Sequence, residues 1–572
     1  MTNRPDTLAK TPAAQSEPIS RVERWIAALL LLSACVLKCV NIFHFRYDSD
    51  EPQHLHTTWG WTQALLQYRD FFDNHTPLFH FLFSPLVAAL GERADILLYM
   101  RFAMVPFWFV ALWAVWRIGS QVFSRRAGLW ATVFISLLCW WFYCALEYRT
   151  DNLWAPLWLC ALALFVTGEL TLKRAFAGGF LLGLCCCTSM KTTVLLAVSA
   201  MAGVFASQIC ARRFSPAALA RLLKPAFVIL AGLLIAPAAV CAFFAAQGCW
   251  KDFYYCVIQH NTLISVDANA HHFYQRLTFF VALPFLLYGG AKVARHAPTP
   301  ALALRRTFLF LFAGLYYVSL ESFWALLTRQ DYLPFYPVAA LVIAPWMIWL
   351  VQNSSWAAHR TAILATVALG EIALLLVGRP PWINNTRDEQ EILREVLQLT
   401  RPGEWVMDFK GESVFRQRAF HYVLEPLVIY RIKHGIIKDT IPQDVVEKEV
   451  HVVVNRNRWY QKPTARFLTA NYLNVGQVRV AGRVLSVEET AADATLSFPV
   501  IIPARYVLVA DGKPIQGGIL DGLPYTGARD LAPGPHTFRP EGTCRRLALF
   551  WERAAQAGYK PVVDRPDWQY ER

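Results

Sequence analysis

Long runs of apolar residues recur from residue 25 to residue 378 and constrain the fold more than any other feature of the chain. Each run has about 18–22 residues, the length that an α-helix needs to cross the ~30 Å hydrocarbon core of a bilayer. A tight pair of runs at 176–210, interrupted at Lys191, supplies two of about eleven spans. The pattern predicts a polytopic α-helical membrane protein. The other runs lie at 25–43, 97–117, 129–147, 152–170, 226–246, 277–294, 307–327, 332–351 and 361–378.

The composition argues against a soluble enzyme and against a nucleic-acid-binding protein. The chain has 55% hydrophobic and only 17% charged residues, whereas a soluble protein carries about 25% charged residues. The formal net charge of +14 would suit nucleic acid only if the basic residues formed a face or a known binding module. They lie instead in short clusters between the apolar runs, as in membrane proteins.

Most of the 13 cysteines lie inside apolar runs, where a thiol behaves as a small hydrophobe. Only Cys249 and Cys256 are candidates for a disulfide. The region beyond residue 380 contains Cys544 alone, so no internal disulfide can hold it.

Lysine and arginine are concentrated in alternate loops, and cytoplasmic loops carry this excess in membrane proteins. The bias places the N-terminal tail, residues 1–24, in the cytoplasm. With an odd number of spans the C-terminal region lies outside, which fits the inner (plasma) membrane of a bacterium and a periplasmic C-terminal domain. The basic loops hold Arg21, Arg24, Arg117, Arg125, Arg126, Lys173, Arg174, Arg212, Arg213, Arg221, Lys224, Lys292, Arg295, Arg305, Arg306 and Arg360.

The first outer loop, residues 44–96, contains two segments with helical character. Residues 77–90 are apolar, but they are too few for a span and include two prolines, so we expect an interfacial or re-entrant helix on the outer side. Residues 52–69 mix tryptophan and leucine with polar residues, as an amphipathic helix on the bilayer surface would. A loose loop is the alternative for this second segment.

Charged residues become frequent after Arg379 and no further span follows. We therefore divide the chain into a transmembrane catalytic domain, 25–379, and an exported domain, 380–572. Residues 387–400 have helical spacing, and several short strands separated by Gly, Pro and Asp turns follow, which predicts a mixed α and β, mostly β, domain. Within it we interpret 408–412 as a surface turn that binds the acceptor or caps the outer cavity. The expected strands lie at 450–454, 475–486, 498–510 and 535–550.

Three carboxylates follow the first span within four residues, at Asp48, Asp50 and Glu51. They repel one another and so need a cation or full solvation. A carboxylate pair beside the membrane suits a general base for an acceptor hydroxyl, or a ligand of a divalent metal. A solvated turn that caps the next helix is the alternative.

Two further groups of polar residues lie where the outer ends of spans converge. His75 lies two residues before Pro77, where the interfacial helix begins. The alternative is that this segment only starts the helix, since proline is common at a helix start. Arg149 lies between Glu147 and Asp151 in a short connection between spans. An ion pair within that connection is the alternative to a functional role.

Isolated charges inside or beside the spans form the last group. Lys191 and Arg329 lie at membrane depth, where a charge costs about 2.5–3.5 kcal/mol and therefore tends to face a cavity or a charged partner. Snorkelling to the interface is the alternative for Lys191. Glu371 lies too deep for an outer site, so we expect it to pair with another span.

In order and spacing these elements resemble the C-type (GT-C) membrane glycosyltransferases over residues 25 to about 350. The similarity is to the branch that holds bacterial relatives of protein O-mannosyltransferases and the lipid-A aminoarabinose transferase. The elements are Asp-Glu after the first span, His-x-Pro-Leu at the interfacial segment, Arg-x-Asp after the third span, a lysine in Thr-Ser-Met-Lys-Thr, and Arg-x-x-Tyr-x-Pro-x-x-Pro.

The resemblance implies a glycosyltransferase that takes a sugar from a polyprenyl-phosphate carrier and inverts the anomeric centre in one displacement. The acceptor would be an envelope glycan, lipid or protein at the outer face of the membrane. Asp50, with Glu51 beside it, and Asp151 fall on the family's acidic positions. The residues that could hold the donor phosphate are His75, Arg149, Lys191 and Arg329.

Two alternatives stay open at this point. A divalent metal ion bound by Asp48, Asp50 and His260 could replace one cation. The resemblance also implies a histidine in the outer loop before the eighth span, where His260, His271 or His272 could serve. A transporter or flippase of a lipid-linked sugar is the alternative function. Transporters often contain inverted repeats, whereas the two halves of this chain show no obvious symmetry.

Overall fold

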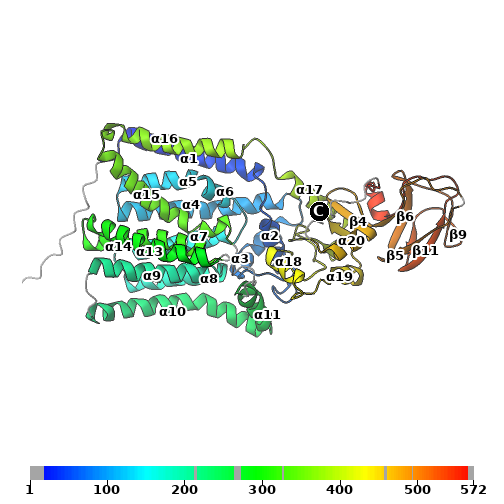
Figure 1. Cartoon of the computed structure of the whole chain (residues 1–572), viewed down its shortest axis with the longest axis horizontal. Coiled ribbons are helices and arrows are strands. Elements are labelled where there is room, and N and C mark those ends of the chain that lie inside the picture. The colour runs from blue at the N-terminus through cyan, green and yellow to red at the C-terminus, as the bar shows by residue number, and fades with distance from the viewer. Residues whose placement is uncertain are drawn as a thin grey trace, which may run out of the picture.

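The computed structural model describes residues 18–211, 216–262, 272–324, 327–455, 460–492 and 494–563. Long helices lie side by side in a bundle, and an α/β part follows at one end of it (Figure 1). Eight helices of the described residues are long and apolar enough to cross a membrane, so the chain is a multi-pass membrane protein. These helices are α1 (Arg21–His44), α4 (Ile96–Val122), α9 (Thr192–Ala211), α10 (Pro216–Ala246), α13 (His272–Arg295), α14 (Pro300–Phe323), α15 (Phe335–Gln352) and α16 (Arg360–Gly378).

The other predicted spans are shorter helices, and one of them is interrupted. The run at 129–147 breaks at Leu138, which frees the N–H of Cys139 from helical hydrogen bonding. Oε2 of Glu371 in α16 accepts a hydrogen bond from this N–H at 3.3 Å, so the predicted pairing of Glu371 with another span is confirmed. These shorter helices are α5 (Arg125–Leu137), α6 (Cys139–Cys144), α7 (Asp151–Val166) and α8 (Leu172–Thr188).

The basic loops gather at the end of the bundle where α1 begins. Arg126 at the start of α5 pairs with Glu23 at the start of α1 at 3.0 Å. Arg306 donates to the carbonyl of Val122 at the end of α4. The opposite end carries the α/β part. The alternation of basic and non-basic loops thus corresponds to two ends of one bundle, and which end faces the cytoplasm stays a prediction.

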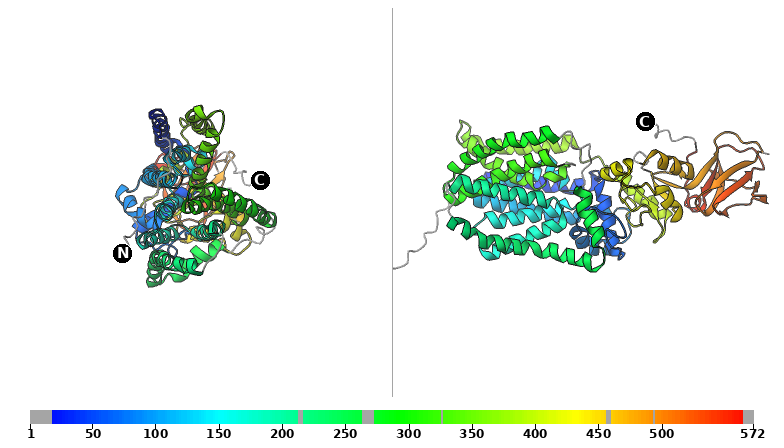
Figure 2. Two further views of the ribbon diagram at one scale, coloured as in Figure 1. Left: turned by 90° about the vertical axis from the view of Figure 1, so that its left-hand side faces the viewer. Right: turned by 60° about the horizontal axis from the view of Figure 1, so that its bottom comes forward.

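Short helices lie between the bundle and the α/β part (Figures 1 and 2). The predicted interfacial helix is confirmed as a helix at 78–90. The predicted surface helix at 52–69 is wrong in its bounds and its setting, because the helix ends at Thr62 and residues 51–60 are all buried. Leu55 and Trp59, which we expected on the bilayer surface, are buried in one apolar cluster with Phe79 and Met100. The short helices are α2 (Asp50–Thr62), α3 (Leu78–Leu90), α11 (Trp250–Tyr254), η1 (Tyr255–Gln259) and α12 (His260–Thr262).

The described residues of the α/β part form four longer helices, one short helix and two sheets. Helix α17 (Arg387–Leu399) forms where helical spacing predicted it, and each expected strand region contains at least one strand. One sheet has the order β1-β2-β4-β12-β6-β10, with β3 beside β4 and β7 beside β6, and the other has the order β5-β11-β8-β9. Only β1 and β2 pair in parallel among these strands of the described chain. The remaining elements are α18 (Pro426–Lys433), α19 (Ile441–Glu447), α20 (Lys462–Asn471), α21 (Glu552–Gln556), β1 (Val406–Met407), β2 (Val452–Val454), β3 (Tyr472–Asn474), β4 (Val478–Ser486), β5 (Leu496–Val500), β6 (Ala504–Ala510), β7 (Lys513–Pro514), β8 (Ile519–Leu520), β9 (Leu523–Pro524), β10 (Arg529–Leu531), β11 (Gly534–Arg539) and β12 (Leu547–Trp551).

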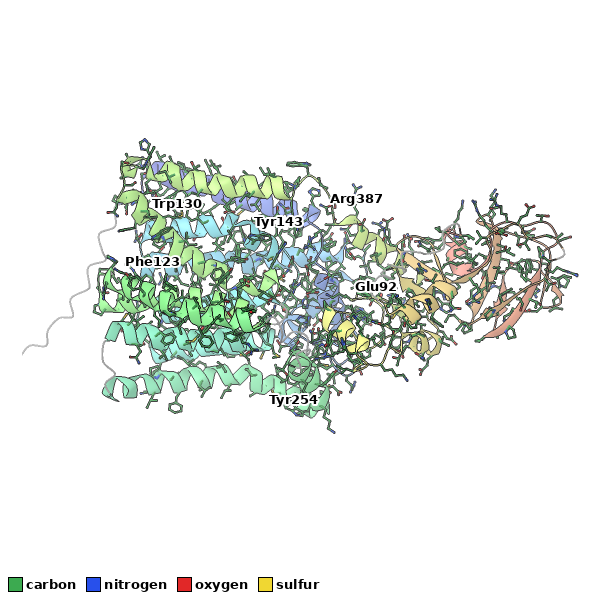
Figure 3. All side chains as sticks on the ribbon, viewed as in Figure 1. Glu92, Phe123, Trp130, Tyr143, Tyr254 and Arg387 are labelled. Atoms are coloured by element: carbon green, nitrogen blue, oxygen red, sulfur yellow. The ribbon has the colours of Figure 1, made fainter. Side chains whose placement is uncertain are left out.

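One hydrophobic core joins the α/β part to the bundle. Leu66, Tyr68 and Phe72, from the loop after α2, are buried in the same cluster as Val406 and Val452 of β1 and β2. Burial of apolar surface contributes about 25 cal/mol per Å², so this shared core fixes the α/β part on the end of the bundle. In Figure 3 Glu92 marks the junction, where its carboxylate pairs with the buried Arg416 at 2.7 Å.

The predicted disulfide between Cys249 and Cys256 is wrong. Both thiols are free and buried, Cys249 directly before α11 and Cys256 in the π-helical turn η1 that follows it. Apolar surroundings account for both cysteines, because a buried thiol behaves as a small hydrophobe.

A buried ion pair fixes α2 to α4. Arg101 donates to both carboxylate oxygens of Glu51, at 2.8 and 2.5 Å, and both side chains are fully buried. The remaining donors of Arg101 go to the carbonyls of Phe45 and Arg46, just beyond α1. The two charges thus satisfy one another and hold the start of α2 against the end of α1.

We expect Glu51→Gln to destabilise the fold strongly, because it leaves the Arg101 guanidinium buried without a counter-charge. Loss of one partner of a buried pair costs about 3–5 kcal/mol. The measurement is the thermal unfolding midpoint of the purified protein in detergent. Glu404→Gln is the control, since Glu404 pairs with Arg553 at a site where both side chains are about one-third exposed and such a pair contributes about 0–1 kcal/mol. Equal effects of the two variants would contradict this assignment.

Candidate active site

The three carboxylates of the acidic triplet after α1 make different contacts. Asp48 and Glu51 serve the local backbone, because Glu51 accepts from the Asp48 N–H at 2.8 Å and Asp48 accepts from the Asp50 N–H at 3.2 Å. Ser49 precedes the helix but makes no side-chain capping bond. The Asp50 carboxylate makes no such bond to a backbone N–H among the described residues and faces two cations and the Ser49 hydroxyl.

Arg149 joins the triplet to the connection between α6 and α7. Its Nη1 lies 2.5 Å from Asp48 Oδ1 and 2.6 Å from Asp50 Oδ2, and its Nε lies 3.4 Å from Asp151 Oδ2. The expected internal pair with Asp151 therefore exists, but shorter contacts reach the triplet. Asp151 opens α7, where a carboxylate also interacts favourably with the positive end of the helix dipole.

Lys191 lies at the break between α8 and α9 and extends the same network. Its ammonium lies 2.9 Å from Asp151 Oδ1 and 2.6 Å from Asp331 Oδ1. Burial would lower the pKa of Lys191, but the two carboxylates outweigh it and raise this pKa above its ordinary value. Lys191 thus has charged partners within the protein and does not depend on snorkelling to the interface.

Lys410, from the α/β part, completes the charge pattern around Asp50. Its ammonium contacts Asp50 Oδ1 and lies 3.3 Å from the Ser49 hydroxyl. Burial alone would raise the pKa of Asp50, but Arg149 and Lys410 outweigh it and hold this pKa well below its ordinary value. Asp50 is therefore ionised over the physiological pH range.

The turn that carries Lys410 is fastened to α2. The Glu412 carboxylate accepts from the N–H groups of Phe409 and Lys410, at 3.0 and 2.7 Å. His56 of α2 bonds through Nδ1 to the Val414 carbonyl at 2.9 Å. These bonds place Lys410 over the start of α2, so the α/β part contributes directly to the site.

Glu147 lies beside this network and differs from its other carboxylates in protonation. Burial, together with the negative charge of Asp48, raises the pKa of Glu147 well above its ordinary value. Gln330 donates to Glu147 Oε2 at 2.7 Å. These conditions favour the protonated form. The other four carboxylates (Asp48, Asp50, Asp151 and Asp331) face Arg149, Lys191 and Lys410, with Arg46 at a longer distance from Asp48.

A group of histidines around a buried carboxylate adjoins the cluster. His75 bonds to Asp73 at 2.9 Å, and His54 bonds to His80 at 3.0 Å. The rings of His54 and His75 meet edge to face at 4.5 Å. His54 lies one turn after Asp50 on α2 and within electrostatic range of it. The N-terminal end of α3 thus approaches the acidic cluster.

Two of the predicted site residues lie elsewhere. Arg329 is exposed, with its guanidinium 4.2 Å from the ring centre of Trp140. His260 bonds to Glu425, just before α18, at 2.9 Å and to Arg431, within α18. His271 lies outside the described residues, and so does the side chain of His272.

The described residues do not assemble the predicted metal ligands. Arg149 occupies the position between Asp48 and Asp50, and His260 is engaged by the α/β part. Nowhere in the described chain do three or more His, Cys, Asp or Glu side chains gather as a metal site would need.

Sequence reasoning placed Lys410 in a turn that binds the acceptor or caps the cavity, without relating it to Asp50, and it did not identify Asp73, His54 or His80 as site residues. The spacing of four between Asp50 and His54 was a usable signal, because such residues share one face of a helix. Lys410 had no such signal, since it lies 360 residues after Asp50. Only the tertiary structure brings these two together.

The long helices, the short helices at one end and the α/β part beyond them form the fold of the C-type (GT-C) membrane glycosyltransferases. ArnT from Cupriavidus metallidurans in the apo state is similar with a TM-score of 0.54 at 12% identity, over 81% of this chain and 98% of that chain. The same protein bound to undecaprenyl phosphate gives a TM-score of 0.52 at 12% identity, over 80% and 98%. At these identities the likeness shows the fold alone.

The apo oligosaccharyltransferase of Archaeoglobus fulgidus has a TM-score of 0.46 at 11% identity, over 79% of this chain and 73% of that chain. No protein-family description and no curated protein sequence matches the chain.

We expect Gly411→Ala to displace the turn that carries Lys410. Gly411 has a φ of +91°, and an added Cβ would lie 2.8 Å from His56 Cβ and 3.0 Å from the Pro52 carbonyl oxygen. The control is Gly403→Ala, where φ is +87° but the space is open, so the backbone strain is similar and the clash is absent. Limited proteolysis of the purified protein should cut after Lys410 faster in Gly411→Ala than in the control. Equal cleavage rates would show that the turn is not held by this contact.

Proposed function

We propose that this protein transfers a sugar from a polyprenyl-phosphate donor to an envelope acceptor, at the outer face of the inner membrane. The observation that carries the proposal is the Asp50 carboxylate, held between Arg149 and Lys410 at the end of a GT-C bundle. The similarity to a protein that has been crystallised with undecaprenyl phosphate supports a lipid-phosphate donor. The acceptor is a glycan, a lipid or a protein.

Asp50 acts as the general base in this proposal. The acceptor hydroxyl attacks the anomeric carbon, a new C–O bond forms, and the bond from that carbon to the phosphate oxygen breaks. The hydroxyl proton moves to the Asp50 carboxylate, and the electron pair leaves with the polyprenyl phosphate. Glu51 then acts as a positioning residue, because Arg101 occupies both of its carboxylate oxygens.

Arg149 and Lys191 receive the leaving phosphate, as charge-assisted hydrogen bonds to a phosphate favour arginine and lysine. Asp151 positions both of them, since it contacts the Arg149 Nε and the Lys191 ammonium. His75 lies within electrostatic range of Asp151 and faces the phosphate from the start of α3. Arg329 lies on Trp140, so a contact with the same phosphate would require it to leave that ring.

Donor binding also activates the base. A phosphate that draws Arg149 away from Asp50 removes one of the two cations that lower the Asp50 pKa. The carboxylate then becomes a stronger base at the moment when the donor is in place. An empty site keeps the carboxylate fully paired.

We expect Asp50→Asn to lower sugar transfer by about 10²–10⁴-fold, the usual contribution of a general base. The assay measures transfer of labelled sugar from a synthetic polyprenyl-phosphate sugar to an envelope extract, at equal amounts of folded protein. Asp95→Asn is the control, because Asp95 pairs with Arg93 at the surface. Unchanged transfer in Asp50→Asn would remove Asp50 as the base. Movement of labelled lipid-linked sugar across vesicles without any transfer would favour the transporter alternative.

We expect Lys410→Met to move the acid limb of the transfer rate to higher pH. The base form of Asp50 exists above its pKa, and transfer falls as the pH drops through that pKa. Removal of Lys410 takes away one of the cations that lower the pKa, so the limb should rise by about one pH unit or more. The measurement is kcat/KM against pH. Lys462→Met, an exposed site on α20, should leave the profile unchanged, and an unshifted limb in Lys410→Met would refute the electrostatic role of Lys410.

A further inference from the structure

A cavity with both apolar and polar lining opens where α1 and α16 end, and its lining residue Arg46 lies 3.8 Å from Asp48 of the carboxylate cluster. Its volume is about 290 Å³, close to the lower limit of about 300 Å³ for small-ligand pockets. Its polar lining comes from Asn41, His44, Arg46, Arg379 and Asn385. No part of the proposed transfer mechanism uses this cavity.

The guanidinium groups at the cavity have little negative charge to balance them. Among the described residues Arg379 has no ion pair, and its guanidinium rests on the rings of Phe45 and Tyr143, at 5.0 and 5.9 Å. Arg46 approaches Asp48 at 3.8 Å, but Asp48 has a much closer partner in Arg149. The cavity thus presents positive charge that the described chain does not neutralise.

Other features of the same place also favour an anion. Burial and the positive charges of Arg46 and Arg329 lower the pKa of Arg379, so both guanidinium groups lie within electrostatic range of it. Nδ1 of His44 is buried and has no hydrogen-bond partner in the described structure. A phosphate oxygen in the cavity would offset these positive charges and could bond to His44.

The surroundings of the cavity are those of a lipid headgroup. Helices α1 and α16 lie next to each other along one edge of the bundle (Figure 1). Apolar side chains near the cavity are exposed, with Phe43 at 45%, Val377 at 80% and Trp382 at 69%. Tryptophan is enriched where a span meets the headgroup region. In Figure 3 Tyr143 lies towards the end of the bundle that meets the α/β part, with Arg387 beyond it.

We propose that this cavity binds the phosphate of an anionic membrane phospholipid, with Arg46 and Arg379 as its ligands. Arginine guanidinium groups bind phosphate oxygens through charge-assisted hydrogen bonds. The donor phosphate fits this cavity less well, because in the proposed reaction it leaves from a carbon beside Asp50. Arg149 and Lys191 bind it there. The lipid would also draw Arg46 from Asp48, which links its binding to the carboxylate cluster.

The test measures lipid binding and requires no sugar transfer, so it is independent of the proposed function. Delipidated full-length protein in detergent is titrated with phosphatidylglycerol, phosphatidylcholine or undecaprenyl phosphate, and the thermal unfolding midpoint is recorded. We expect phosphatidylglycerol to raise the midpoint at concentrations where phosphatidylcholine does not. Arg379→Gln should weaken the phosphatidylglycerol response about tenfold. Arg387→Gln removes the same charge outside the cavity lining and should respond like the wild type.

Three results would overturn the proposal. Equal shifts of the wild-type unfolding midpoint with phosphatidylcholine and phosphatidylglycerol would show that the site does not select an anionic headgroup. This result would refute the proposal without any variant. An undiminished response of Arg379→Gln would remove the cavity as the site. A response to undecaprenyl phosphate alone, lost in Arg379→Gln, would assign the cavity to the donor. If Arg379→Gln does not fold, Arg46→Gln replaces it.

Discussion

Charges that leave water at the end of a helical bundle must find partners, and this requirement organises the whole junction between the two parts of the protein. Arg149 satisfies it for Asp48, Asp50 and Asp151, which come from the loop after α1, the start of α2 and the start of α7. Arg101 does the same for Glu51 deeper in the bundle. The two arginines differ in consequence: Arg101 pairs with one carboxylate in a fully buried site, whereas Arg149 is shared among three carboxylates, two of which have further cation partners in Lys410 and Lys191.

The membrane helices were predictable because span length and hydropathy are local properties of the chain. The same holds for α17, whose apolar spacing marks its bounds. The setting of α2 was not predictable, since its burial depends on residues that follow more than 300 positions later, among them Val414. Asp50, Arg149 and Lys191 stood out as charged residues beside apolar runs, and the structure brings them together. Lys410 was expected in a turn that binds the acceptor or caps the cavity, and nothing in its spacing related it to Asp50. Cys249 and Cys256 gave a false disulfide because spacing alone cannot orient two thiols.

The α/β part is more than a cover in this arrangement. It shares a hydrophobic core with the loop after α2, supplies the second cation for Asp50, and takes His260 out of reach of the acidic cluster. The electrostatic state of the carboxylate therefore depends on both parts of the chain at once. A separated bundle would contain the same spans, but its Asp50 would lack the Lys410 ammonium as a partner.

The distance along the chain between Asp50 and Lys410 has a consequence for biosynthesis. The two residues are 360 positions apart, and domains generally fold as units while synthesis proceeds from the N-terminus. The spans enter the membrane while Asp50 still lacks its second cation, and the charge pattern closes only after the α/β part has emerged and docked. A nascent or truncated chain thus holds the carboxylates and the first cation without the arrangement that the complete protein uses, and maturation of the site coincides with completion of the chain.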